Sequence, residues 1–176
     1  NNSINGLVHA ENKANTKIQG KINYLKNDKD NAIESNNANV FVQGSENIIE
    51  ATKGISSIDK SEVKLQATDS NVINAKEFGI YTKEQGVVNL NATNANNTVY
   101  VENGYGISGN NSAININSQS GNNSIEVAQG IAIEANNGSN ISVNANKGQN
   151  NIKASDTAIS VNKNNIDKDI ATTSTS

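Results

Sequence analysis

Apolar residues recur along the chain in short groups that repeat about every 25 residues. The second group of each repeat pairs a small residue with an aliphatic one, as in Ala32-Ile33 and Gly79-Ile80. In the third group apolar and polar positions alternate, as from Val88 to Ala92, which is the period of a strand with one face buried. The first group is an Asn-x-aliphatic triplet, and its seven copies start 21 to 27 residues apart, at Asn2, Asn23, Asn47, Asn71, Asn97, Asn123 and Asn150.

Three short β elements that recur in a fixed order predict a parallel β-solenoid, in which one repeat forms one turn. We expect an all-β, three-faced solenoid of about 6 to 7 turns with roughly 25 residues per turn. Residues 1–170 would form a single segment of a longer solenoid, with Ile166 and Ile170 in a last partial turn or cap. Residues 171–176, rich in Thr and Ser, would form a disordered tail.

The aliphatic residues of each group are predicted to stack in three inward columns, about 4.8 Å from turn to turn. Each fully buried side chain contributes about 1.5 to 3 kcal/mol, so even a narrow core can support the fold. The first column is Leu25, Ile49, Ile73, Val99, Ile125 and Ile152. The second is Leu7, Ile33, Ile55, Ile80, Ile107, Ile131 and Ile159. The third is Ile18, Val42, Leu65, Leu90, Ile116 and Val143.

The asparagine that opens each first group recurs in register, which predicts a structural role. Asparagine tolerates the left-handed backbone region, so we expect it at a sharp corner of each turn. Stacked side-chain amides can also hydrogen-bond from turn to turn as a ladder. The predicted asparagine ladder comprises Asn23, Asn47, Asn71, Asn97, Asn123 and Asn150, with Asn2 at its start.

A second amide column occupies the fourth place of the third group and is predicted to face solvent. Two interpretations stay open: the amides stiffen an exposed sheet, or they dock a partner chain or glycan through many weak hydrogen bonds. Four tyrosines, Tyr24, Tyr81, Tyr100 and Tyr105, are candidates for outward aromatic contacts, and Tyr81 and Tyr100 join the partner-binding set. The amide column of that set is Gln19, Gln43, Gln66, Asn91, Asn117 and Asn144.

Composition bears on whether the chain folds at all. Asparagine accounts for 36 of 176 residues, and Leu, Ile, Val and Phe together for only 39, a proportion close to that of disordered chains. However, 33 of those 39 are Ile or Val, whose β-branched side chains favour strands. The net charge of −3 predicts no nucleic-acid partner.

The residues needed for catalysis are scarce. The chain has no Cys, Arg, Met, Pro or Trp and a single histidine, His9, which excludes thiolate or multi-histidine metal sites. Asp28 and Asp30 share one loop but lack the Gly and Glu of a calcium-binding EF-hand loop. The carboxylates scatter over the repeat, and no nucleophile elbow is present. We therefore expect no catalytic residues, metal site or cofactor, and a polysaccharide-degrading β-helix enzyme is only a third alternative.

Asn-rich, Cys-free turns of 20 to 27 residues with Val-x-Leu-Asn-Ala and Gly-Ile groups, over residues 2–166, resemble the passenger domain of monomeric autotransporter adhesins of Gram-negative bacteria. The resemblance implies a right-handed β-helix displayed on the cell surface or secreted. It further implies a parent chain with a signal peptide and an outer-membrane barrel.

Such adhesins mediate aggregation, biofilm formation or attachment to host cells. The implied partner is a protein or glycan on another bacterial or host cell, or a second copy of the chain. The alternative is a structural stalk that projects a recognition domain located elsewhere in the parent.

Overall fold

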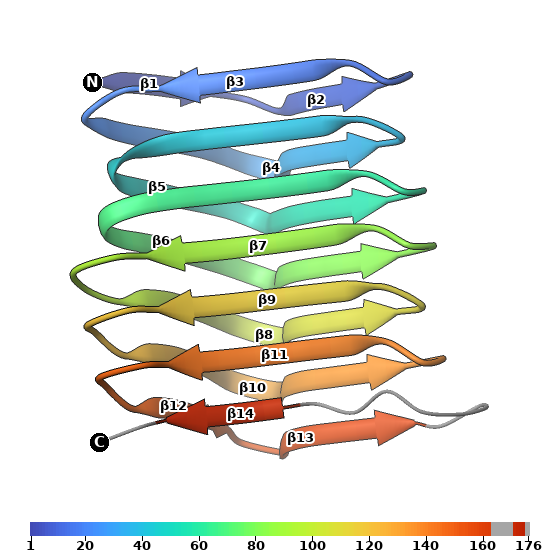
Figure 1. Ribbon diagram of the computed structural model, residues 1–176. Helices are drawn as coiled ribbons and strands as arrows, with labels where there is room; N and C mark the ends of the chain where they lie inside the picture. The colour runs from blue at the N-terminus through green and yellow to red at the C-terminus, as the bar shows by residue number, and fades with distance from the viewer. Residues whose placement is uncertain (163–170, 175–176) are drawn as a thin grey trace.

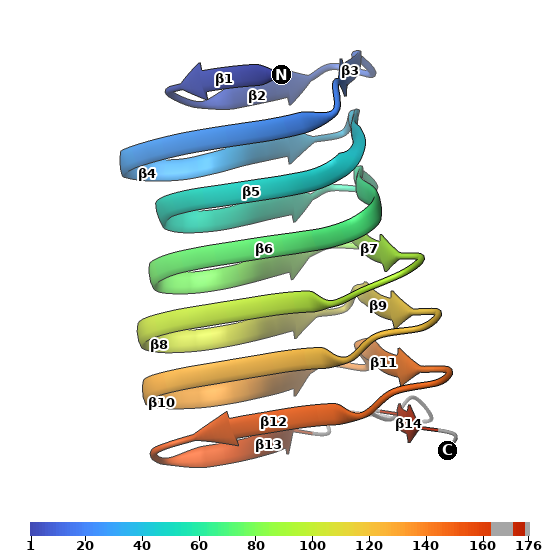
Figure 2. The same cartoon turned by 90° about the vertical axis from the view of Figure 1, so that its left-hand side faces the viewer.

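The computed structural model describes residues 1–162 and 171–174, and it is a parallel β-solenoid of about six turns with roughly 25 residues per turn. Figure 1 shows a right-handed coil: the chain crosses the front from right to left, returns behind and descends. Each turn has three sides, which we call the first, second and third side after the three groups of the repeat (Figure 2). Among the described residues, none forms a helix with the length and apolarity needed to cross a membrane.

The strands follow this three-sided course. In the first turn the sides are the separate strands β1 (Asn2–Asn5), β2 (Val8–Glu11) and β3 (Asn15–Gln19). In the next turns the strands continue around the bends, as β4 (Ile22–Asn36), β5 (Asn39–Ile58) and β6 (Glu62–Lys83). Later turns separate the third side from the other two, giving β7 (Val87–Ala92), β8 (Asn97–Asn110), β9 (Ala113–Ser118), β10 (Asn123–Asn136), β11 (Asn140–Ala145), β12 (Asn150–Ala154), β13 (Thr157–Asn162) and β14 (Ala171–Ser174).

Equivalent residues of successive turns pair in parallel register. On the first side Asn71 pairs with Asn97 and Asn97 with Asn123, although 26 residues separate each pair. On the third side Leu65 pairs with Leu90, as the repeat predicts. Backbone hydrogen bonds therefore run from turn to turn, parallel to the solenoid axis.

The first and third inward columns are confirmed. Leu25, Ile49, Ile73, Val99 and Ile125 are at most 1% exposed, and Ile152 in the last first-side strand is partly buried. The third-side column from Ile18 to Val143 is buried throughout. A further buried column lies two residues upstream on the third side and comprises Val40, Val63, Val88, Ile114 and Ile141.

The second column is correct at four positions and wrong at two. Ile33, Ile55, Ile80 and Ile107 are fully buried, and they pair in register with Val8 at the start and Ile133 at the end. Leu7 is instead 44% exposed and Ile131 is half-buried, so neither belongs to the column. Ile159 keeps the register of the column but is 42% exposed.

Leu7 and Ile131 were wrongly placed in the second column because the glycines before the aliphatic residue are of two kinds. Gly79 lies inside the coil, where an added Cβ would come 2.6 Å from the Gly106 carbonyl oxygen, so only glycine fits beside the buried Ile80. Gly6 and Gly130 instead have φ angles of 133° and 134°, which glycine adopts without strain. They shape the bend, and the inward aliphatic residue follows later in the chain.

The ladder asparagines also differ from the prediction in their backbone conformation. They lie in extended strand, and none is among the residues with positive φ. The left-handed positions occur instead between the second and third sides, for example at Asn37, Asp59 and Asn137 with φ of 48° to 51°. The sharp corner is therefore made by turn residues at the surface, whereas the ladder asparagines point into the core.

The expected tail differs as well. Ala171–Ser174 form β14, which pairs with β11 on the third side, where a disordered segment was predicted. Pairing satisfies the backbone groups along the edge of β11. Ile166 and Ile170, expected in a partial turn, lie outside the described residues, as do residues 175–176.

Candidate binding surfaces

The asparagine ladder runs inside the coil and uses its amides fully. Each Nδ2 donates to Oδ1 of the equivalent asparagine in the next turn, at 2.7 to 2.9 Å, from Asn2 through to Asn150. The second Nδ2 hydrogen of each reaches a backbone carbonyl, for example Asn71 to Asn91 O at 3.0 Å. Asn23 to Asn123 are at most 1% exposed, so the ladder joins the first and third sides and offers no surface to a partner.

The outer face of the third side carries the predicted solvent-facing amides. We call it the amide face, and it consists of two parallel columns. One is Gln19, Gln43, Gln66, Asn91, Asn117 and Asn144, and the other is Lys17, Phe41, Lys64, Asn89, Asn115 and Ser142. Most of these side chains are half-buried by their neighbours and keep one edge in solvent.

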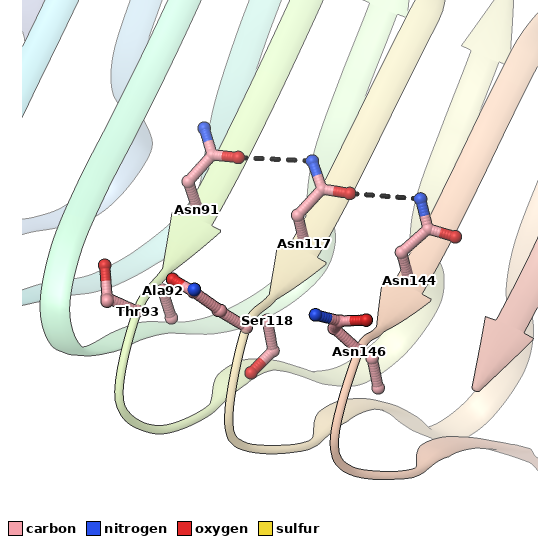
Figure 3. Close-up of a pocket in the computed structure, with 9 residues that line it drawn as sticks. Asn91, Ala92, Thr93, Asn117, Ser118, Asn144 and Asn146 are labelled. Carbon is pink, nitrogen blue, oxygen red and sulfur yellow. Dashed lines mark hydrogen bonds between the residues drawn. The ribbon is translucent and has the colours of Figure 1, made fainter. Parts of the chain in front are cut away.

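Hydrogen bonds run between turns in the C-terminal half of the amide face. Asn117 Nδ2 donates to Asn91 Oδ1 at 3.1 Å, and Asn144 Nδ2 donates to Asn117 Oδ1 at 3.2 Å (Figure 3). In the neighbouring column Asn115 Nδ2 donates to Asn89 Oδ1 at 2.9 Å. These bonds fix the amide planes and point them in one direction along the axis.

A groove of about 550 Å³ lies beside this row of asparagines and crosses three turns. Figure 3 shows the three amides along it, with the turn residues opposite. Ala92, Ser118 and Ala145 also line the groove, although they are themselves buried. The groove is open to solvent and polar on the amide side.

The N-terminal half of the amide face differs in character. Phe41 lies between two lysines, with Lys17 Nζ 5.8 Å and Lys64 Nζ 5.5 Å from its ring centroid. A second hollow of about 390 Å³ surrounds this aromatic ring. The face thus combines an apolar, cationic half with an amide half.

The structure places no tyrosine on the amide face. Tyr24 and Tyr100 lie on the first side, where the Tyr24 hydroxyl donates to Glu50. This hydrogen bond, followed by burial and the nearby negative charges, raises the pKa of Tyr24. Tyr81 and Tyr105 lie on the second side, together with Phe78. The predicted partner-binding set therefore divides among three sides.

Phe78 is a surface residue that the sequence pattern did not single out. Because Gly79 and Ile80 both point inward, Phe78 and Tyr81 on either side of them both point outward. The inward pair in each second group could have predicted this, because the residues on either side of the pair must face outward.

Several charged side chains form ion pairs on the surface. Asp28 and Asp30, expected in a loop, lie in β4, where the register shifts between Asn27 and Asn31. Lys26 lies 3.4 Å from Asp28, and Lys53 lies 3.3 Å from Asp30, so each aspartate has a lysine partner. Lys83 Nζ lies 2.8 Å from Glu84, which raises the pKa of Lys83 through the hydrogen bond and the opposite charge. Within the described residues, no three His, Cys, Asp or Glu side chains gather closely enough to hold a metal ion.

Comparison with known proteins does not place the chain in a family. No protein-family model, no curated protein and no solved structure matches it at a significant level. Function must therefore be argued from the surfaces themselves.

Proposed function

We propose that the chain is a bacterial cell-surface adhesion module that binds through the amide face. Its partner would be a protein or glycan on another bacterial or host cell, or a second copy of the chain. The observation that carries the proposal is the row of Asn91, Asn117 and Asn144 beside a groove that crosses three turns. Binding, without catalysis or a cofactor, is the activity that this polar and repetitive surface favours.

The chemistry of the amide supports this proposal. An amide both donates and accepts hydrogen bonds, so a row of them can pair with a peptide backbone or with sugar hydroxyls. Successive amides stand about 4.8 Å apart, so an extended ligand lying along the axis meets one at each turn. Phe41 adds an apolar anchor at the other half of the face, of the kind that contributes strongly to interfaces.

A structural stalk is the second candidate, and one observation favours it. The asparagines of the amide face already bond to one another, so part of their capacity stiffens the sheet. A stiff, regular solenoid would suit a chain that projects a recognition domain away from the cell.

A charge-insertion experiment separates the two. In Gln66→Lys, Asn91→Lys, Asn117→Lys, three lysines replace one column on consecutive turns of the amide face. We expect binding of the labelled chain to Gram-negative bacteria and cultured epithelial cells, or clustering of chain-coated beads, to fall by about tenfold or more. The physical reason is that three ammonium groups would replace the amides that pair with the ligand.

The matched control introduces the same charge on another side. In Thr98→Lys, Ser124→Lys, Asn151→Lys, the lysines also occupy one outward column on consecutive turns. Parent-like binding by this control, with an unchanged circular dichroism spectrum for both variants, supports the amide face. Absence of binding by the parent chain favours the stalk.

A further inference from the structure

The second side carries an aromatic groove that the proposed function does not use. One part of its lining is formed by Phe78, Tyr81, Tyr105, Asn110, Glu134 and Asn136. They come from three consecutive turns, on β6, β8 and β10. The groove has a volume of about 500 Å³, within the range of small-ligand sites.

Register brings the aromatic rings together. Phe78 pairs with Tyr105 of the next turn, and the rings of Phe78 and Tyr81 lie 5.8 Å apart at an angle of 50°. Serines flank Tyr81 in its own column, Ser56 one turn before and Ser108 one turn after. These small neighbours leave Tyr81 half-buried, with the Phe78 ring as its aromatic neighbour. Tyr105 is 39% exposed, so aromatic surface is available to a ligand.

Polar groups border the rings on one side. Glu134 Oε2 accepts a hydrogen bond from Ser108 Oγ at 2.9 Å, which holds the carboxylate beside the aromatic residues. Asn110 and Asn136 stand in register on consecutive turns, and Asn110 Oδ1 accepts from Asn137 Nδ2 at 2.9 Å. Fixed carboxylate and amide groups of this kind can orient a ligand that carries hydroxyls.

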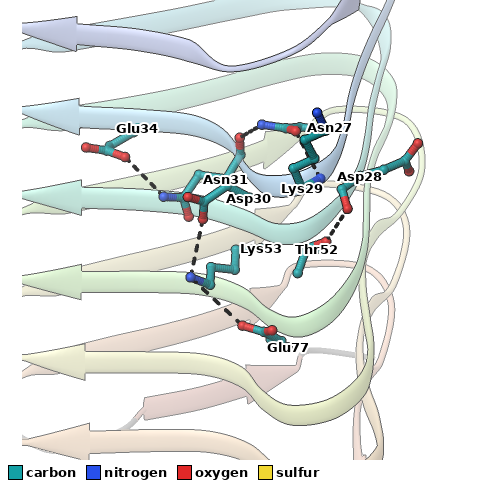
Figure 4. Close-up of polar contacts among 9 residues, drawn as sticks. All are labelled: Asn27, Asp28, Lys29, Asp30, Asn31, Glu34, Thr52, Lys53 and Glu77. Atoms are coloured by element: carbon teal, nitrogen blue, oxygen red, sulfur yellow. Dashed lines mark hydrogen bonds and ion pairs between the residues drawn. The ribbon is translucent and has the colours of Figure 1, made fainter.

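At the opposite end of the groove, two carboxylates balance the charge of a lysine. Lys53 lies between Asp30 at 3.3 Å and Glu77 at 4.0 Å, as Figure 4 shows, with its ammonium 5.9 Å from the Phe78 ring. Its charge is therefore balanced, which disfavours an anionic ligand. Asn31 also lines this end of the groove, where its Nδ2 donates to Glu34 at 3.1 Å and its Oδ1 is buried without a partner.

This combination selects one ligand class. A pyranose sugar has an apolar C–H face that packs on an aromatic ring, and hydroxyls at its edge that pair with carboxylates and amides. Nucleic acid would need unpaired cationic groups, and strand addition would need a free sheet edge, whereas the strands under the groove are paired on both sides. We propose that the aromatic groove binds a neutral glycan, with one pyranose ring against Tyr81 and Tyr105. The site is independent of the amide face.

Saturation-transfer NMR with lactose, cellobiose, maltose and chitobiose tests this proposal, with sialyllactose as an anionic comparison. The chain has no Trp and four Tyr, so tyrosine emission provides a second readout. We expect saturation transfer to at least one neutral disaccharide. We also expect its dissociation constant to rise by about tenfold or more in Tyr81→Ala and in Tyr105→Ala, because each ring supplies apolar contact.

Two controls locate the effect. Tyr100→Ala removes an exposed tyrosine of similar accessibility on the first side, and should leave the dissociation constant unchanged. The lysine variant of the amide face should also keep sugar binding, so failure of either proposal leaves the other standing. No transfer to any neutral sugar, binding of sialyllactose alone, or an equal loss in Tyr100→Ala would overturn the proposal.

Discussion

A side-chain amide has two hydrogens and one carbonyl oxygen, and the ladder position employs them all. Asn97 donates to Asn123 Oδ1 at 2.9 Å and to the Asn117 carbonyl at 2.8 Å, and it accepts from Asn71 Nδ2 at 2.9 Å. Aspartate lacks the donors, and glutamine would need more room. The requirement for asparagine thus follows from hydrogen bonding inside the coil and not from the left-handed backbone that we expected.

Replacing Asn97 by alanine should destabilise the chain strongly. The change leaves the buried amide oxygen of Asn123 without its donor and the buried Nδ2 of Asn71 without this acceptor, and each unsatisfied buried group costs about 1 to 3 kcal/mol. Asn94→Ala, at an exposed asparagine of the same turn, should change the free energy of unfolding by no more than about 0.5 kcal/mol. Urea unfolding followed by circular dichroism measures both, and equal midpoints would contradict the ladder.

At the scale of the element, alternation predicts the straight strands better than the bends. The inward residues of the third side are predicted correctly because polar and apolar residues alternate along it, as in β7 and β9. The second side begins at a bend, where a small residue and the next aliphatic one both point inward and the alternation is interrupted. The sequence therefore identifies the core pair there only if the role of the glycine is known.

The two isoleucines of β10 provide the test of this register. Ile133 is fully buried, so Ile133→Ala should cost about 2 to 5 kcal/mol, whereas Ile131→Ala removes a half-buried side chain and should cost about 1 kcal/mol or less. The two variants remove the same atoms from one strand, which makes them a matched pair. A larger loss of unfolding free energy for Ile131→Ala would restore the register first predicted from the sequence.

The whole molecule is stabilised through contacts between adjacent turns. Each turn pairs with the one before and the one after, and the core columns run the full length of the described solenoid. Such an arrangement behaves as a one-dimensional stack, in which stability rises with each added turn. Binding surfaces can consequently change from turn to turn while the core repeats, as the amide face and the aromatic groove do.

Deletion of residues 97–122 removes one complete turn and joins Asn96 to Asn123. Because Asn123 occupies the same ladder position as Asn97, it can pair with Asn71 in the shortened chain. We expect a cooperatively unfolding β-solenoid with a lower thermal midpoint, measured by circular dichroism. A disordered spectrum would show that the turns are not interchangeable.

The sequence by itself determined the repeat, the three-sided turn, two of the three core columns and the positions of the ladder asparagines. These features follow from local alternation and spacing, which recur in every turn. Tertiary structure alone decided which glycines face the core, that the ladder lies inside the coil, and that Phe78, Tyr81 and Tyr105 meet on one face. The physical reason is that contacts between turns depend on strand register and on the direction of each bend. Because the turns differ in length, neither can be read from the spacing of residues along the chain.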